Sequence, residues 1–189
     1  LKIQTKGLYV DIGGYHPIKG SLKNYLYESG WNGINVDLSQ ASIDLFNISR
    51  PKDKNIRAAI TDFDGNTYYN ENGLINQQNS LEGNSEKKIK VKAYKLNSLL
   101  EELSVNKINY LNIDAEGHDF KIISEFNFNK YRPQLISIEH NSYKSHDIIS
   151  SSMHTLISKN KYFLASKYGV TSIYIDSGYE DKIDKLMSI

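Results

Sequence analysis

Short apolar runs alternate with amphipathic stretches along this chain, and turn residues separate the two. The runs that we interpret as buried strands are 8–12, 34–36, 56–60, 110–113 and 134–138. The stretches with apolar residues at helical spacing include 21–29, 41–46 and 96–103. A strand that is repeatedly followed by a helix is typical of a mostly parallel sheet with helices on both faces. The pattern therefore predicts an α/β fold.

Two segments depart from this alternation. Residues 61–88 are rich in Asn, Gly, Gln and Ser without a clear period, and we interpret them as a hairpin or long loop inserted at the edge of the sheet, followed by a short edge strand at 89–93. Near the end, 162–165 and 172–175 resemble an antiparallel pair that closes the sheet. We therefore expect one domain over 1–189, built on a seven-stranded, mostly parallel sheet with an irregular insertion at about 61–88.

Composition narrows the class of partner. The 23 basic residues nearly cancel the 22 acidic ones, so the net charge of +1 gives no electrostatic footprint for nucleic acid or an anionic membrane. The chain has no cysteine, and no apolar run approaches the roughly 20 residues that span a bilayer. We therefore expect a cytoplasmic protein with a small-molecule or carbohydrate partner and no membrane insertion. The oligomeric state stays open.

Glycines and acids stand where the predicted strands end, which is where open parallel sheets bind ligands. Gly13 and Gly14 follow the first strand, and Asp37 ends the second, 24 residues after Gly13. An acid at about this separation can accept hydrogen bonds from both hydroxyls of a ribose. The loop VDIGGYHP lacks both phosphate-binding patterns, G-x-G-x-x-G and G-x-x-x-x-G-K-[ST]. The ligand should carry a ribose without a phosphate chain, and Asp11 is suited to a cationic group. S-adenosylmethionine (SAM) meets both demands.

Six sequence blocks resemble the FkbM family of methyltransferases in order and spacing. They are VDIGGYHPIKGS, YESGWNGINVDLS, RPKDKN, YLNIDAEGHDF, RPQLISIEHN and TSIYID, and they extend over nearly the whole chain. The resemblance implies a class I, Rossmann-like SAM-methyltransferase fold and O-methyltransferase activity. The chain departs from the family at Leu22 and Lys23, where Asn-Thr is frequent, and at Leu38, where proline is frequent.

The resemblance also implies roles for individual residues. Asp11, Gly13 and Gly14 would hold the methionine portion of SAM, and Asp37 would hold its ribose. The remaining implied cofactor contacts are Ala59 and Asp62 near the adenine, Ser21, and Asp114, whose carboxylate would face the methyl donor.

Two devices could remove the proton from a hydroxyl acceptor. In the first, His16 or His140 is the base, because histidine titrates near neutrality. In the second, Asp114 and Glu139 hold a divalent metal ion together with His140 or Asn141. We favour the metal-free device, since only two firm carboxylates are available.

Purely structural roles are alternatives to the functional roles of several of these residues. Asp37 could simply cap the following helix, His16 could close the turn before Pro17, and His118 and His146 have the positions of surface or capping residues. The acceptor implied by the family is a hydroxyl of a sugar or small polar metabolite, as in surface-polysaccharide or secondary-metabolite tailoring. The alternatives are a degenerate SAM-binding module without catalysis and a nucleotide-sugar or NAD-dependent enzyme.

Overall fold

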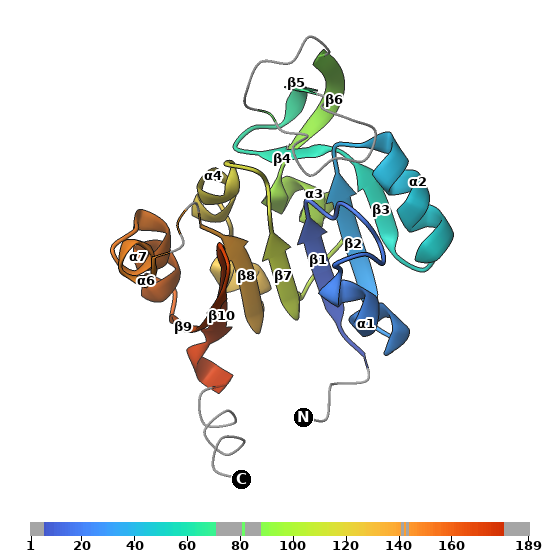
Figure 1. The fold of residues 1–189 in the computed structure, drawn as a ribbon. Helices are drawn as coiled ribbons and strands as arrows, with labels where there is room; N and C mark the ends of the chain where they lie inside the picture. Colours follow the sequence, from blue (N-terminus) through green and yellow to red (C-terminus); the bar gives the residue numbers. More distant parts are fainter. Residues whose placement is uncertain (1–5, 71–80, 82–87, 141, 143, 180–189) are drawn as a thin grey trace.

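A computed structural model describes residues 6–70, 81, 88–140, 142 and 144–179 of the chain. Figure 1 shows one large twisted sheet, with a smaller sheet standing over the ends of its central strands. No helix in the described ranges is long and apolar enough to cross a membrane.

The large sheet has seven strands in the order β3-β2-β1-β7-β8-β10-β9. Their bounds are β1 Leu8–Ile12, β2 Asn32–Asp37, β3 Lys54–Arg57, β7 Tyr110–Ile113, β8 Leu135–Glu139, β9 Tyr162–Tyr168 and β10 Thr171–Asp176. The five strands from β3 to β8 pair in parallel, whereas β10 runs antiparallel to both of its neighbours, so the sheet is mixed. The chain builds outward from β1 to β3 and then crosses to β7, which places the switch in direction between β1 and β7.

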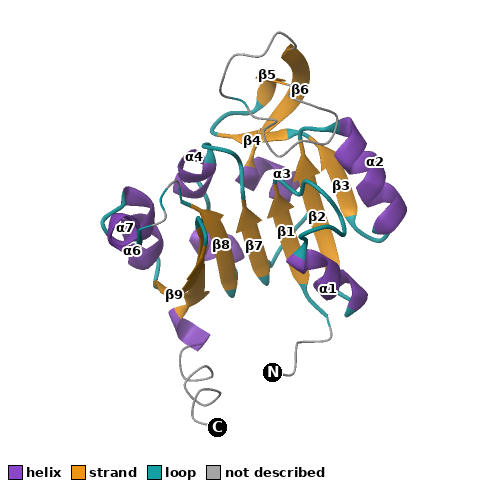
Figure 2. Ribbon diagram, in the orientation of Figure 1, coloured by secondary structure: helices purple, strands orange, loops and turns teal. Residues whose placement is uncertain are grey.

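Helices cover both faces of this sheet (Figure 2). Their bounds are α1 Leu22–Glu28, α2 Gln40–Ser49, α3 Leu96–Glu102, α4 Asp119–Ser124, α5 Phe128–Tyr131, α6 Ser145–Ile149 and α7 Ser152–Lys159, and a 3₁₀ turn follows at Ser177–Tyr179. Successive residues of a strand point to opposite faces. In β1, Val10 joins the main core together with Leu100 of α3, whereas Tyr9 packs with Trp31 beside Leu26 of α1.

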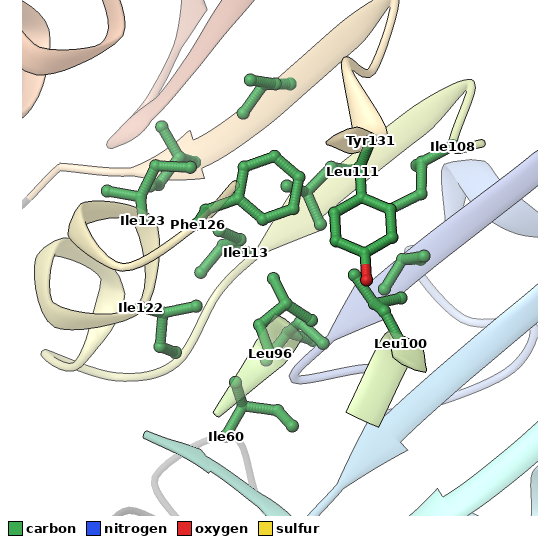
Figure 3. Close-up of a cluster of buried hydrophobic side chains, with 14 of the residues drawn as sticks. Ile60, Leu96, Leu100, Ile108, Leu111, Ile113, Ile122, Ile123, Phe126 and Tyr131 are labelled. Carbon is green, nitrogen blue, oxygen red and sulfur yellow. The ribbon is translucent and has the colours of Figure 1, made fainter. Parts of the chain in front are cut away.

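The main core is an apolar layer between the sheet and the helices α3, α4, α5 and α7. Figure 3 shows Leu111 and Ile113 of β7 together with Leu96 of α3 in this layer. The rings of Phe126 and Tyr131 stack with centroids 5.8 Å apart. Burial of this layer anchors β7, and with it the turn that carries Asp114 and Glu116.

The second sheet corrects three sequence-based expectations. It consists of β4 (Ala59–Thr61), β6 (Lys88–Lys95) and β5 (Gly65–Asn70), in that order. The run 56–60, predicted as one strand, is divided between β3 and β4 at Ala58. The run 89–93 lies in the central strand of the small sheet instead of at an edge of the large one. Part of the predicted irregular insertion is β5, while 71–80 and 82–87 lie outside the described residues.

Long-range pairing explains why this small sheet escaped the sequence analysis. The β5 strand ends at Asn70 and its partner β6 begins only at Lys88, so local pattern could indicate a strand at 89–93 but not its pairing. Their shared inner face buries Tyr69, Val91 and Ala93 with Ala59 of β4. The small sheet therefore has a core of its own, and Ala59 connects that core to the cavity described next.

Candidate active site

A cavity of about 280 Å³ opens at the carboxyl ends of the central strands. One part of its wall is apolar and consists of Ile12, Val36, Leu38, Ala58, Ala59, Ile60 and Leu81. The acids in its wall are Asp37, Asp114, Glu116 and Glu139. Gly13, Tyr15, Ala115, His118 and Val170 complete the lining. The cavity thus combines an apolar slot beside the small sheet with a cluster of carboxyl groups beside β7 and β8.

The turn after β1 brings the backbone close to two neighbouring strands. Gly13 has φ +77°, and a Cβ at this position would collide with the carbonyl oxygen of Asp114. Its amide donates to Val36 O at 2.9 Å. Beside it, a Cβ on Gly14 would lie 3.0 Å from the Phe46 ring. Glycine is therefore required at position 13 by conformation and by space.

Asp37 extends from the end of β2 toward the cavity. Its Oδ2 accepts a hydrogen bond from the Tyr15 amide and its Oδ1 one from the Ser39 amide, both at 2.8 Å. Burial raises the pKa of Asp37, although these two backbone hydrogen bonds act in the opposite direction. Each carboxylate oxygen keeps a second lone pair, so Asp37 can accept from two further hydroxyls.

Asp114 and Glu139 lie at the ends of the adjacent strands β7 and β8 and interact with each other. Burial, and then repulsion from Asp114, raises the pKa of Glu139 to about 8. Burial also raises the pKa of Asp114, whose side chain lines the open cavity. Glu116 adds a third acid on a residue with φ +47°. A cation in the cavity would relieve the repulsion among these groups.

Asp11 lies beneath the cavity, outside its lining. Its side chain is fully buried, and Oδ1 is bound by Lys23 Nζ at 3.1 Å and by Asn112 Nδ2 at 2.9 Å. Lys23 comes from α1, on the same face of the sheet as Tyr9. The predicted contact of Asp11 with a cofactor stays a prediction, and the described structure shows a buried ion pair in its place.

The family model described as Methyltransferase FkbM domain matches residues 11–162 of the chain. The chain belongs to the FkbM methyltransferase family. Neither a curated protein nor a solved structure matches it. The match begins within β1 and ends at the first residue of β9. It therefore covers every strand end that contributes an acid to the cavity of this FkbM methyltransferase.

Neither of the two histidines proposed as a base lies in the lining of the FkbM cavity. His16 Nδ1 accepts from the amides of Ile18 and Lys19, at 3.1 and 3.0 Å, and so closes the turn. His140 is buried directly after β8, where its Nε2 lies 3.3 Å from Tyr174 Oη. Burial, and then the positive charges of His154 and Lys167, lowers the pKa of His140 to about 4. The placement favours the turn-closing alternative for His16 and leaves His140 outside the cavity lining.

Four of the eight expected cofactor residues line the cavity, namely Gly13, Asp37, Ala59 and Asp114. The other four, Asp11, Gly14, Ser21 and Asp62, do not. Ser21 stands at the N-cap of α1, but its hydroxyl accepts from Arg50 Nη2 at 2.7 Å instead of capping the helix. Asp62 is exposed and accepts from Thr61 Oγ1 at 3.1 Å.

Sequence reasoning missed several residues of the lining. His118, interpreted as a surface or capping residue, does precede α4, but it is buried and faces the cavity. Tyr15 has φ +52°, and Leu81 and Val170 reach the cavity from distant segments. Among these residues, only His118 had a sequence signal for the cavity, because it lies four residues after Asp114. Within the described ranges no group of three or more metal-ligating side chains occurs, and Asn141 lies outside those ranges.

Proposed function

We propose that this FkbM protein is a SAM-dependent O-methyltransferase that acts on a hydroxyl of a sugar or small polar metabolite. The observation that carries the proposal is Asp37, a strand-terminal acid that faces a cavity with both oxygens oriented by backbone amides. Such an acid at the end of the second strand suits a ribose. The order of the five parallel strands supports a class I methyltransferase fold.

The two halves of the cavity fit the two ends of SAM. The apolar slot formed by Ala59, Ile60 and Leu38 suits an adenine ring, which lies between apolar side chains in most such sites. The acids Asp114 and Glu116 suit the positively charged methionine end, because a cation nearby favours their ionised form. When bound, SAM supplies an electrophilic methyl group on a positively charged sulfur.

Glu139 is the group best suited to take the proton of the acceptor hydroxyl. It lines the cavity, and its pKa of about 8 makes it a stronger base than an ordinary carboxylate. Asp114 beside it contributes to that pKa through repulsion. The carboxyl groups around Glu139 also favour a neutral, hydroxylated acceptor over an anionic one, because a second anion would be repelled.

Methyl transfer to a panel of neutral sugars and polyols tests this function. The assay detects S-adenosylhomocysteine (SAH) and a methyl mass gain on the acceptor. We expect turnover that survives a chelator and that Glu139→Gln reduces by about 10²-fold or more, the usual contribution of a general base. Glu125→Gln, on an acid that pairs with Lys95 outside the cavity, is the matched control. Loss of activity with chelator and its return with magnesium would assign the acids to a metal ion, and methylation of amines alone would exclude an O-methyltransferase.

A further inference from the structure

The run RPKDKN resembles a family block, yet the proposed function gives it no role. Three of its residues, Arg50, Asp53 and Asn55, belong to one network of polar side chains on the face of the sheet covered by α1. Arg50 is fully buried, and Asp53 is 9% exposed. A cation buried to this degree is costly unless its donors are used, so its partners indicate what the network does.

Two donors of the Arg50 guanidinium, both on Nη2, bind the loop that connects β1 to α1. Its Nη2 donates to Pro17 O and to Ser21 Oγ, the latter at 2.7 Å. The guanidinium also lies over the ring of Phe46, 5.2 Å from its centroid, and that ring packs against Gly14. Arg50 therefore contacts the 13–21 loop directly at its C-terminal half and through Phe46 near its start.

Tyr9 connects this cation to a counter-charge. Arg50 Nη1 donates to Tyr9 Oη at 3.3 Å, and Tyr9 Oη donates to Asp53 Oδ2 at 2.5 Å. Burial, and then Asp53, raises the pKa of Tyr9, so the hydroxyl keeps the proton that it donates. Asp53 is held in turn by the Gly33 amide at 2.6 Å and by Asn35 Nδ2 at 3.0 Å. The strands β1 and β2 thus fix the position of Arg50.

The opposite side of the same loop forms part of the cavity. The Tyr15 amide donates to Asp37, and Tyr15 itself lines the cavity two residues before Pro17. A shift of Pro17 or Ser21 would therefore move the amide that orients Asp37. Arg50 therefore does not contact Asp37, the predicted ribose acceptor, and can influence it only by positioning the loop.

We propose that Arg50 is a positioning residue that sets the 13–21 loop, and through Tyr15 and Asp37 the affinity for a nucleoside cofactor. Tyr9 and Asp53 hold Arg50 in the orientation that the loop requires. The part of this proposal that concerns affinity rests on the proposed function. The part that concerns the loop does not, since it can be measured without any ligand.

Two variants with different risks to folding test the proposal. Tyr9→Phe keeps the buried ring and removes only the hydroxyl between Arg50 and Asp53. Arg50→Lys keeps the charge and loses the planar fork that reaches Pro17 and Ser21 together. We expect amide hydrogen exchange in 13–21 to become faster in both, because the loop opens more often. We expect the dissociation constant for SAH to rise about tenfold, the equivalent of one hydrogen bond. The turnover number at saturating SAM should change less than about twofold, because no reacting group is altered.

Lys54→Met is the matched control, since Lys54 lies on β3 and donates to Leu103 O at 3.4 Å, away from the loop. It should leave both loop exchange and SAH affinity as in the wild type. Unchanged loop exchange in folded Tyr9→Phe would overturn the proposal and reduce the network to a support of the fold. A wild-type protein that binds no SAH would contradict the proposed function instead, while the exchange measurement would still decide the role of Arg50.

Discussion

At the scale of single residues, the cavity depends on acids that the fold places in different surroundings. Asp37 accepts hydrogen bonds from two backbone amides and is oriented by them, whereas Glu139 faces another acid and accepts none from the amides of the described residues. The two carboxyl groups therefore suit different tasks. A fixed acceptor suits a neutral ribose, and a carboxyl with a raised pKa suits proton transfer.

Replacement of Asp37 separates a ligand contact from a purely structural role, since the predicted alternative of capping α2 is filled by Ser39. We expect Asp37→Ala to weaken SAH binding by about 1.5–3 kcal/mol, the range for hydrogen bonds to a charged group, while the protein stays folded. Asp44→Ala, on an exposed acid of α2 that accepts from Gln40, is the control. Calorimetry gives both affinities. An unchanged dissociation constant in Asp37→Ala would leave this acid only its hydrogen bonds from the Tyr15 and Ser39 amides.

The raised pKa of Glu139 predicts how stability depends on pH. The folded protein binds this proton up to about pH 8, whereas the unfolded chain loses it near the ordinary value of 4.5. The stabilising contribution is therefore fully present below pH 4.5 and is lost as the pH rises through about 8. Glu139→Gln is neutral throughout, so its melting temperature should exceed that of the wild type by a margin that grows from about pH 5 to about pH 9. A margin that shrinks with pH would show that the pKa is not raised, and Glu28→Gln, on an exposed acid of α1, controls for general charge effects.

At the scale of elements, the turn between β1 and α1 connects the sheet to the cavity. Gly13 and Gly20 both have positive φ within this turn, but only Gly13 has a neighbour where a Cβ would stand. The difference offers a matched pair of substitutions. Comparison of the two substitutions tests whether the turn must approach Asp114 closely or whether it needs only glycine's left-handed backbone conformation.

Gly20→Ala should cost about 1 kcal/mol, because an L-residue there must adopt left-handed backbone angles in open space. Gly13→Ala bears a similar conformational cost and adds a collision with the Asp114 carbonyl, so we expect a further loss of about 1–3 kcal/mol and weaker SAH binding. Denaturant unfolding measures the free energies of unfolding. Equal losses at the two positions would mean that the turn moves freely away from β7.

At the scale of the whole molecule, local pattern predicted most of the acids at strand ends, although Asp11 and Asp62 lie outside the cavity lining. Asp37, Asp114 and Glu139 were expected in the site because each ends a buried apolar run, and all three line the cavity. Features built from distant segments were not accessible in this way. Lys23 pairs with Asp11 from a neighbouring helix, and Val170 reaches the cavity from the closing hairpin, so neither follows from spacing along the chain.

The most direct test of the central claim is a calorimetric comparison of ligands on the unmodified protein. If Asp37 and the apolar slot bind a nucleoside without a phosphate chain, SAM and SAH should bind in the micromolar range while NAD and ATP give no saturable heat. SAM carries one more positive charge than SAH, so its attraction to the acids beside β7 and β8 should make the affinity for SAM fall as the salt concentration rises. Binding of NAD that is tighter than binding of SAH would contradict the account.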